Sequence, residues 1–389
     1  MESVSGLPDK SMRVLLVANY KPDFQRSMAR YADFLYAELL KRGYAVEMIR
    51  PEPIVTRLVD RTNRFFRWLA YLDKFVFFPP RLWLRARKAD VVHVCDHGNA
   101  PYLRWTGKTP NLITAHDALA IRSALGQFPQ NPTRASGIKF QQWILRGLAH
   151  AKRIVCVSQK TRQDFEALLP GGPSMTVIFN PLSSVFRPAR AEDVAAARAA
   201  CGLGPEDEYL LHVGKDNWYK NRPGVLRIFA ELRNHARFSN IKLVMAGTPL
   251  PAALRQRAQD LGGVAECVGF SDEQLRALYT GALALLFPSL EEGFGWPILE
   301  AQACGCPVIT SARPPMMEVA GKAAILIDPE DPVGAAAVIA ERIHEVDALR
   351  LAGFENIKAY SMDDAIDRYC KVYEELASAS PRSSKNTVV

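Results

Sequence analysis

The sequence lacks several patterns, and each absence removes a class of protein. Its 389 residues hold no apolar run near the roughly 18 residues that a membrane-spanning helix needs. No Gly-x-Gly-x-x-Gly follows either of the two first strands expected below, which argues against a dinucleotide-dependent oxidoreductase. No Asp-x-Asp pair stands at an expected strand end, so we expect no metal. Seven cysteines without a Cys-x-x-Cys spacing give no zinc framework, and we expect them to be reduced and buried.

Two further absences bear on processing and organisation. The first residues, MESVSGLPDKSMR, show no basic stretch followed by an apolar one, so we expect a cytoplasmic protein. Neither an internal repeat nor a low-complexity block occurs. With 48% hydrophobic and 23% charged residues, the composition is that of an ordinary globular protein, and the length fits two domains.

Charge is distributed unevenly along the chain. The net charge is +8, but residues 1–180 hold 27 Lys and Arg against 14 Asp and Glu, a balance of +13. The remaining residues hold 22 against 27, a balance of −5. The basic N-terminal half therefore favours an anionic partner such as a membrane surface, a lipid phosphate or a nucleic acid.

Short apolar runs alternate with helical patterns in the first half of the chain. Strands are expected at Arg13 to Asn19, Ala45 to Ile49, Ala89 to Val94, Asn111 to Ala115, Arg153 to Val157 and Thr176 to Phe179. Helical patterns lie near residues 27–41, 139–149 and 160–168. This alternation predicts a doubly wound α/β domain over residues 1–180.

A second α/β series follows the linker Asn180 to Pro188, which holds two prolines and two serines. Its expected strands are Tyr209 to Val213, Lys242 to Ala246, Glu266 to Gly269, Ala282 to Phe287, Pro307 to Thr310 and Ala324 to Ile327. Its expected helices lie near residues 223–235, 251–261, 272–279 and 297–304. We place this domain at 189–360, a terminal helix at 361–377 that packs back toward the first domain, and a disordered tail at 378–389.

Residues 57–88 depart from this alternation. The segment mixes basic residues with aromatic ones. The basic residues are Arg57, Arg61, Arg64, Arg67, Lys74, Arg81, Arg85, Arg87 and Lys88, and the aromatic ones are Phe65, Phe66, Trp68, Tyr71, Phe75, Phe77, Phe78 and Trp83. The mixture suits a segment in an anionic membrane interface, but also a basic helix packed on its own sheet. No nucleic-acid-binding motif accompanies the charge, so we expect no nucleic-acid partner.

Two stretches of the second half carry chemistry. One reads YLLHVGKDNWYKN, where Gly214 allows close backbone approach and Lys215 and Lys220 can neutralise a diphosphate. The other reads PSLEEGFGWPILEAQACGCPVITS and holds Glu292 and Glu300 eight positions apart, with Pro297 expected at the first position of a helix. The start of a helix after a glycine loop, at the carboxyl edge of a parallel sheet, is suited to binding an anion.

Together these stretches resemble the second domain of retaining, nucleotide-sugar-dependent glycosyltransferases of family four, which have the GT-B fold of two facing Rossmann-like domains with a cleft between them. EGFGWPILEA matches the family's E-x7-E motif, and GCPVITS, PMMEVAG and the Gly-then-Lys-Asn pattern follow the family as well. VGFSDEQLRALYTGALALLFPS, VCVSQKTRQDF and FNPLSSVFRP add support, so the resemblance covers nearly the whole chain.

The resemblance implies a role for each matching residue. Glu300 accepts the ribose hydroxyls of the donor, and Gly269 and Phe270 lie along its base. Glu292 and the backbone of Gly293, Phe294 and Gly295 hold the sugar and phosphate. Lys220 and Lys215 meet the diphosphate, beside Gly214, and His116 lies near the anomeric carbon. Lys220, Glu292 and His116 are the implied catalytic residues.

The resemblance also implies the reaction and leaves alternatives. It implies hexosyl transfer from a nucleotide diphosphate sugar to a glycan or lipid-linked acceptor in polysaccharide biosynthesis, without a cofactor or metal. The first residues and the basic aromatic segment 57–88 indicate a cytoplasmic enzyme, peripheral on the inner face of a membrane if that segment contacts lipid. The glycine-rich loop that many relatives carry after the first strand is replaced by NYKPDFQRSMARY. Gln25, Arg26 and Ser27 in this loop are the candidates for donor contacts from the first domain. The acceptor candidates are Arg26 and, in VCDHGNA, Asp96 and His97. A nucleotide-sugar-binding subunit without transfer activity and a sugar-nucleotide epimerase of the same fold remain open.

Overall fold

The computed structural model describes residues 12–379, and these fall into two compact units. The first unit comprises residues up to Val157, Thr161–Ile178 and the chain from Asp363 onward. The second comprises Ser158–Lys160 and Phe179–Met362. The expected tail at 378–389 lies almost entirely outside the described residues.

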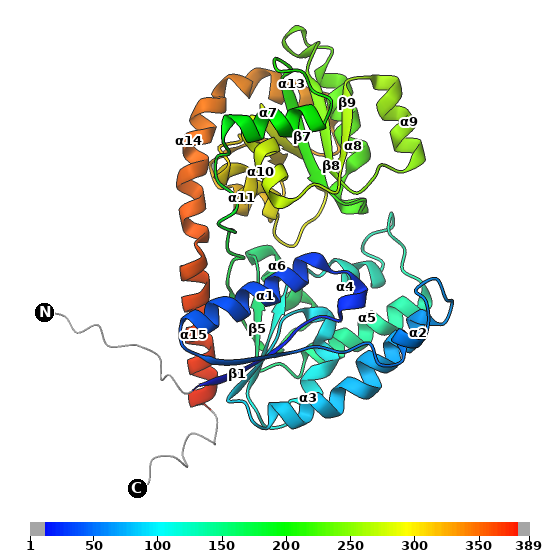
Figure 1. Cartoon of the computed structure of the whole chain (residues 1–389), viewed down its shortest axis with the longest axis vertical. Coiled ribbons are helices and arrows are strands. Elements are labelled where there is room, and N and C mark those ends of the chain that lie inside the picture. The colour runs from blue at the N-terminus through cyan, green and yellow to red at the C-terminus, as the bar shows by residue number, and fades with distance from the viewer. Residues whose placement is uncertain (1–11, 380–389) are drawn as a thin grey trace, which may run out of the picture. The chain divides into compact units, whose positions relative to one another are not determined.

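The first unit is built on a parallel six-stranded sheet in the order β2-β1-β3-β4-β5-β6 (Figure 1). Its strands are β1 Arg13–Val17, β2 Ala45–Ile49, β3 Val91–Val94, β4 Asn111–Ala115, β5 Arg153–Cys156 and β6 Ser174–Val177. The central strands β3 and β4 are buried along their whole length, as expected for strands covered on both faces. The strand order reverses between β1 and β3, so the two crossovers from this point run to opposite sides.

Helices and helical turns connect these strands. They are η1 Lys21–Asp23, α1 Arg26–Lys41, η2 Thr56–Leu58, α2 Phe66–Leu72, η3 Asp73–Phe77, α3 Phe78–Ala86, η4 His97–Trp105, α4 Leu119–Ala124, α5 Ala135–Leu148 and α6 Gln159–Leu168, and α15 Met362–Ser378 returns at the end of the chain. From Asp363 onward α15 is part of the first unit.

Buried hydrogen bonds attach α15 to the first sheet. The hydroxyl of Tyr369 accepts a hydrogen bond from Tyr31 on α1, and the hydroxyl of Tyr373 is 2.7 Å from Nδ1 of His93 on β3. At the helix surface, Arg42 pairs with Asp363 at 2.8 Å. The sequence predicted a helix here but not these partners.

The second unit has another parallel six-stranded sheet, in the order β12-β11-β10-β7-β8-β9. Its strands are β7 Tyr209–Gly214, β8 Lys242–Gly247, β9 Val264–Val268, β10 Ala284–Phe287, β11 Val308–Ser311 and β12 Ala324–Ile327. Leu210, Val225, Phe229 and Leu286 lie in its core, where the sheet meets the helix that follows β7. The strand order reverses between β7 and β10.

The helices of the second unit surround this sheet. They are α7 Ala191–Ala200, η5 Trp218–Lys220, α8 Arg222–Leu232, η6 Ala236–Phe238, α9 Ala252–Leu261, α10 Asp272–Gly281, α11 Trp296–Ala303, α12 Met316–Ala320, α13 Pro332–Arg342, η7 Ile343–Glu345, α14 Val346–Asn356 and η8 Ile357–Tyr360. Figure 1 shows α7 beside α10, and α8 and α9 near β8 and β9. Both units thus have the α/β architecture with a parallel sheet that the alternation predicted, and the Rossmann-like domains that the resemblance implied.

Segment 57–88 forms three consecutive helical pieces, α2, η3 and α3, which follow one another along one side of the first unit (Figure 1). The inner aromatic rings pack on α5 and η4, where Phe75 lies 4.7 Å from Trp143 and Phe78 lies 5.0 Å from Tyr102, centroid to centroid. Asp73 is fully buried, and its carboxylate accepts a hydrogen bond at 2.8 Å from Tyr20. The segment is therefore firmly attached to its own unit.

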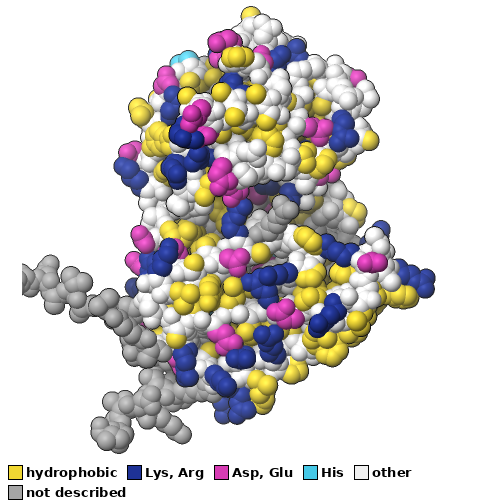
Figure 2. Space-filling model, viewed as in Figure 1, with side chains coloured by type: hydrophobic (Ala, Val, Ile, Leu, Met, Phe, Trp, Pro, Cys, Tyr) yellow, Lys and Arg dark blue, Asp and Glu magenta, His cyan; other side chains and the backbone are white. Residues whose placement is uncertain are grey.

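The outer side of the same segment remains exposed. Trp68 is 72% exposed and Val76 is 54% exposed. Other exposed apolar side chains of the segment are Leu58, Phe65, Tyr71, Leu72, Phe77, Trp83 and Leu84. Figure 2 shows hydrophobic and basic side chains interspersed over the part of the first unit where Figure 1 places α2 and α3. The packing of the segment on its own unit is thus confirmed for the inner side, and contact with a membrane stays a prediction.

One expectation about the cysteines was wrong. Cys201 at the end of α7 and Cys267 on β9 form a disulfide, whereas we expected every cysteine to be reduced. The other five cysteines are free and buried, as predicted. The pairing joins residues 66 positions apart in sequence, which spacing alone could not indicate.

Candidate functional site

The second unit brings Lys220 and Glu292 together at the point where its strand order reverses. Lys220 follows β7 and Glu292 follows β10, and these strands are neighbours in the sheet. In open α/β sheets, ligands bind outside the carboxyl ends of the strands at such a reversal. The two residues are 72 positions apart, so the sheet and not the local sequence makes them neighbours.

The two side chains form a short and largely buried ion pair. Nζ of Lys220 donates to Oε1 of Glu292 at 2.6 Å, and the side chains are 13% and 8% exposed. The ammonium group also lies 4.6 Å from the ring centroid of Phe287. Ser289 donates its hydroxyl hydrogen to the same carboxylate oxygen at 2.9 Å. Because charge-assisted bonds of this kind are directional, both side chains have fixed orientations.

Asn221 joins the loop after β7 to the loop after β10. It has a left-handed backbone (φ +52°), which asparagine tolerates better than most residues, and it directly precedes α8. Its amide donates at 3.0 Å to the carbonyl oxygens of Pro288 and Pro329. The backbone N–H of Leu290 donates to Tyr219 at 2.8 Å. These bonds hold Lys220 against the Glu292 loop.

The Glu292 loop ends in a glycine turn at the start of α11. Gly295 has φ +107°, a conformation that favours glycine, and immediately precedes the helix. We expected Pro297 at the first position of the helix. The helix begins at Trp296, so Pro297 takes the second position. Phe294 is buried, and the carbonyl oxygen of Gly293 accepts a hydrogen bond from Ser158 at 2.7 Å. These contacts hold the glycine end of the loop in place.

Glu300 lies in the middle of α11 and contacts a buried tyrosine. Its Oε2 accepts a hydrogen bond from the hydroxyl of Tyr279 on α10 at 3.0 Å. Burial, followed by the charge of Glu300, raises the pKa of Tyr279 well above its ordinary value. The hydroxyl therefore stays protonated and donates at any physiological pH.

The remaining predicted donor residues lie on loops of the second unit. Gly214 ends β7, where an added Cβ would lie 3.4 Å from the side chain of Lys220. Gly269 directly follows β9 with φ +78° and no atom within 4 Å of an added Cβ, and Phe270 comes next. Lys215 is exposed on the loop after β7, so the structure buries only one of the two predicted cations.

The first unit has its own polar cluster where its strand order reverses. Asn19 follows β1 and Asp96 follows β3, and the amide of Asn19 donates to Oδ2 of Asp96 and to Gln25. Asp96 also accepts the backbone N–H of Gly98 at 2.9 Å. Burial opposes ionisation of Asp96, but His97 and the amide of Asn19 outweigh it and lower its pKa.

His116 completes this cluster of the first unit. It follows β4, and its Nε2 is 2.9 Å from the carbonyl oxygen of Cys95, which can only accept, so Nε2 carries the proton. Nδ1 is buried and has no hydrogen-bond partner among the residues that the structure describes. Burial lowers the pKa of His116, so the ring is neutral with an unpaired acceptor. Arg26 begins α1, and its side chain lies outside the described part.

Sequence reasoning missed three residues of these clusters. Ser289 and Tyr279 contact the two glutamates of the E-x7-E motif, and Asn19 bridges Gln25 and Asp96. Asn19 had a detectable signal, because a polar residue directly after a buried strand lies at the carboxyl edge. Tyr279 and Ser289 had none beyond their general location. Across residues 12–379, no three His, Cys, Asp or Glu side chains are grouped as metal ligands.

Buried histidines make stability depend on pH. Burial lowers the pKa of His93 and of His212 to about 3, and it lowers that of His116. The unfolded chain binds protons at these rings below about pH 6.5 while the folded one does not, so stability is full above pH 6.5 and falls below it. We expect a loss of about 1 kcal/mol per fully shifted ring for each pH unit below 6.5.

Melting temperatures at pH 7.5 and pH 5.5 check this expectation. The carboxylates with lowered pKa values titrate at lower pH and do not contribute to the change in melting temperature between pH 7.5 and pH 5.5. A melting temperature that stays constant, or rises, between pH 7.5 and 5.5 contradicts it.

Comparison with known proteins identifies the family. The model described as "Glycosyltransferase Family 4" matches residues 28–185, and the model described as "Glycosyl transferases group 1" matches residues 193–351. The chain belongs to glycosyltransferase family four. The two matched segments correspond closely to the two units.

Similar curated proteins include several D-inositol 3-phosphate glycosyltransferases. One from Mycobacterium sp. (strain JLS) is 29% identical over 67% of this chain, and one from Frankia alni is 31% identical over 54%. The matching region spans only 58% and 53% of the length of these two relatives.

Solved structures share the fold at low sequence identity. Sucrose-phosphate synthase from Thermosynechococcus elongatus is 18% identical, with a TM-score of 0.71 over 95% of this chain and 100% of that one. HepE from Anabaena, solved in complex with UDP and glucose, is 14% identical, with a TM-score of 0.70 over 94% of this chain and 100% of that one. The fold of this glycosyltransferase is GT-B.

Proposed function

We propose that this glycosyltransferase moves a sugar from a nucleotide diphosphate sugar to a glycan or lipid-linked acceptor, with retention of the anomeric configuration. The observation that carries the proposal is the Lys220–Glu292 pair at the strand-order reversal of the second unit, one loop away from Glu300. A cation and the start of a helix can bind a diphosphate, and two carboxylates can accept hydrogen bonds from sugar hydroxyls.

We assign each part of the nucleotide sugar to residues of the second unit. We assign the ribose hydroxyls to Glu300, because a carboxylate accepts two hydrogen bonds at once. The base lies along Gly269 and Phe270, and the sugar lies at Glu292. The N–H groups of residues 293–295, at the positive end of α11, meet sugar hydroxyls and phosphate.

The diphosphate is the leaving group, and its negative charge must be stabilised. Lys220 supplies a fixed ammonium group, with Lys215 as a second cation beside Gly214, and the start of α11 adds its partial positive charge. Lys215 lacks the bidentate geometry of an arginine, so it acts as a point charge. We propose that these groups stabilise the leaving group without a metal ion.

Retention follows from attack on the face from which the diphosphate departs. The bond from the anomeric carbon to the diphosphate oxygen breaks, and a bond to the acceptor hydroxyl oxygen forms on the same face. The departing phosphate oxygen takes the hydroxyl proton. We assign to His116 a contact near the anomeric carbon through its unpaired Nδ1, which can accept a sugar hydroxyl.

The acceptor groups of the proposal lie in the first unit. Asp96 and His97 follow β3, and Arg26 begins α1 after the Asn19–Gln25 contact. The ionised carboxylate of Asp96 can accept a hydrogen bond from a hydroxyl group of the acceptor substrate. The relatives named for D-inositol 3-phosphate make that compound one reasonable acceptor to try first, together with glycan and lipid-linked acceptors.

Release of nucleoside diphosphate tests the proposal. A thermal-shift screen of UDP-, GDP-, ADP- and dTDP-sugars selects the donor, since a ligand that binds the folded state raises its melting temperature. We expect that donor to release its nucleoside diphosphate only when an acceptor is added, equally in EDTA and in magnesium. Binding without release under any acceptor indicates a binding subunit, and conversion of the donor sugar without an acceptor indicates an epimerase.

We further propose that the outer side of segment 57–88 contacts an anionic membrane surface, where a lipid-linked acceptor is found. Exposed aromatic and aliphatic side chains lie among nine basic residues there, the combination that binds interfacially. No helix within residues 12–379 has both the length and the apolarity to cross a membrane. Contact is thus expected to be peripheral.

Flotation with liposomes checks the membrane contact. The protein is expected to float with vesicles containing anionic phospholipid at low salt and less at 0.5 M salt, because screening weakens attraction between exposed charges. Trp68→Ser/Val76→Ser removes two exposed apolar side chains and is expected to lower the floated fraction severalfold. Leu351→Ser, 69% exposed on α14, is the matched control. No flotation of the wild-type protein at low salt refutes this contact.

A further inference from the structure

Tyr279 is a buried side chain whose only polar atom contacts Glu300. The residue is fully buried on α10, and its hydroxyl donates to Oε2 of Glu300 at 3.0 Å. Because its pKa is raised well above the ordinary value, the hydroxyl remains a donor when Glu300 is ionised. The bond favours the ionised carboxylate and restricts its orientation.

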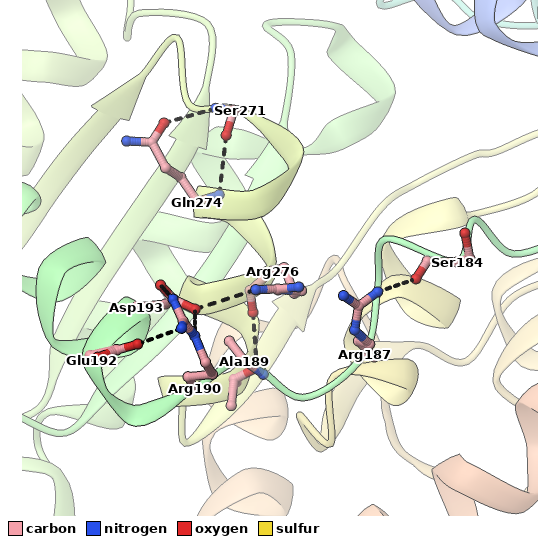
Figure 3. Close-up of polar contacts among 10 residues, drawn as sticks. Ser184, Arg187, Ala189, Arg190, Glu192, Asp193, Ser271, Gln274 and Arg276 are labelled. Atoms are coloured by element: carbon pink, nitrogen blue, oxygen red, sulfur yellow. Dashed lines mark hydrogen bonds and ion pairs between the residues drawn. The ribbon is translucent and has the colours of Figure 1, made fainter.

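The helix that carries Tyr279 is itself anchored along its length (Figure 3). At its start, Ser271 and Gln274 form a reciprocal capping box. In its middle, Arg276 pairs with Asp193 of α7 at 3.4 Å. Near its end, the hydroxyl of Thr280, next to Tyr279, accepts the backbone N–H of Ala189 at 3.0 Å. The tyrosine therefore projects from a rigid support.

The contact joins two helices that the chain connects through β10 and the Glu292 loop. Glu300 lies on α11 between the buried residues Leu299 and Ala301, which fix the helix on the sheet. The backbone of Glu300 is thus positioned by its own helix, and the carboxylate is positioned by a residue of another helix. A glutamate side chain has three rotatable bonds, and ordering it before the ligand arrives removes an entropy cost from binding.

We propose that Tyr279 is a positioning residue for the nucleotide donor, acting through Glu300. This inference rests on the proposed role of Glu300 at the donor ribose and extends it to a residue outside the family motif. Tyr279 is fully buried and its hydroxyl contacts Glu300, so we expect its loss to weaken donor binding and to leave the chemical step almost unchanged.

The test compares two conservative variants of the full-length protein. Tyr279→Phe keeps the ring and removes the hydroxyl, and we expect the KM for the nucleotide sugar to rise about tenfold while kcat stays within about twofold. Tyr209→Phe is the matched control, because Tyr209 is equally buried and its hydroxyl donates to Leu278 of the same helix at 2.6 Å. The control is expected to lower the melting temperature similarly and to leave KM unchanged.

The outcomes separate this inference from the proposed function. An unchanged KM in Tyr279→Phe, with a raised KM in Glu300→Ala, overturns the positioning role and leaves the donor site intact. Equal rises in KM for Tyr279→Phe and Tyr209→Phe also overturn it, because they indicate a general packing defect. An unchanged KM in Glu300→Ala shows instead that the proposed donor site is wrong. Tyr279→Phe is expected to have no further effect in the Glu300→Ala background.

Discussion

Replacement of Lys220 with alanine is expected to lower turnover at least about tenfold, the loss typical of removing one contact to charge that develops in the transition state. The ammonium group is the largely buried cation of the candidate site and donates to Glu292, whose same carboxylate oxygen accepts a hydrogen bond from Ser289. Lys322→Ala removes an exposed lysine of the same unit and is expected to leave turnover unchanged. Steady-state rates with the selected donor and acceptor measure the difference.

The same substitution also leaves Glu292 without its cation, so stability must be separated from catalysis. A buried carboxylate that loses its partner is destabilising, whereas removing both charges is far less so. Lys220→Ala/Glu292→Gln is therefore expected to recover melting temperature relative to Lys220→Ala without recovering turnover. Wild-type turnover in Lys220→Ala would remove the lysine from the mechanism.

Glu300→Ala is expected to reduce kcat/KM for the donor by about tenfold or more, since a carboxylate bonded to two hydroxyls contributes more than a neutral group. Glu300→Gln retains the shape and one acceptor oxygen, so its loss is expected to be smaller. Glu341→Ala, an exposed glutamate at the end of α13, controls for removal of a negative charge from this unit. Donor titrations at saturating acceptor give the kinetic constants.

A pattern of effects distinguishes the two site residues. Loss at Lys220 is expected in kcat, because the leaving group acquires its charge during the reaction. Loss at Glu300 is expected mainly in KM, because the ribose is held equally in ground and transition states. Donor kinetics of Glu300→Ala that match the wild type would contradict the ribose assignment.

The strands could be predicted because buried parallel strands are continuous apolar runs. Ala45–Ile49, Asn111–Ala115 and Ala324–Ile327 have the predicted bounds, and most other strands differ by one or two residues. The loop that contains Glu292 could also be predicted from the sequence, because Gly-Phe-Gly and Pro297 indicate a turn before a helix. The helix nevertheless begins one residue earlier, at Trp296.

Side-chain contacts between distant elements could not be predicted. Asn19 and Asp96 are 77 residues apart in sequence. The pairing of β1 with β3 brings them together, and this pairing depends on the order of the strands in the sheet and not on the local sequence around either residue. Likewise, nothing local distinguishes Phe75, which packs against Trp143, from the exposed Trp68 seven residues earlier. Which side of an amphipathic segment is buried depends on the partner surface that the fold supplies.

Binding of a nucleoside diphosphate tests the central claim most directly, because it requires the site in the second unit but no acceptor. Calorimetric titration of UDP, GDP, ADP and dTDP in EDTA is expected to show one of the four binding to the wild-type protein. That ligand is expected to bind at least about tenfold more weakly to Lys220→Ala and to Glu300→Ala. No binding of any of the four, or equal affinity for all three proteins, would contradict the account.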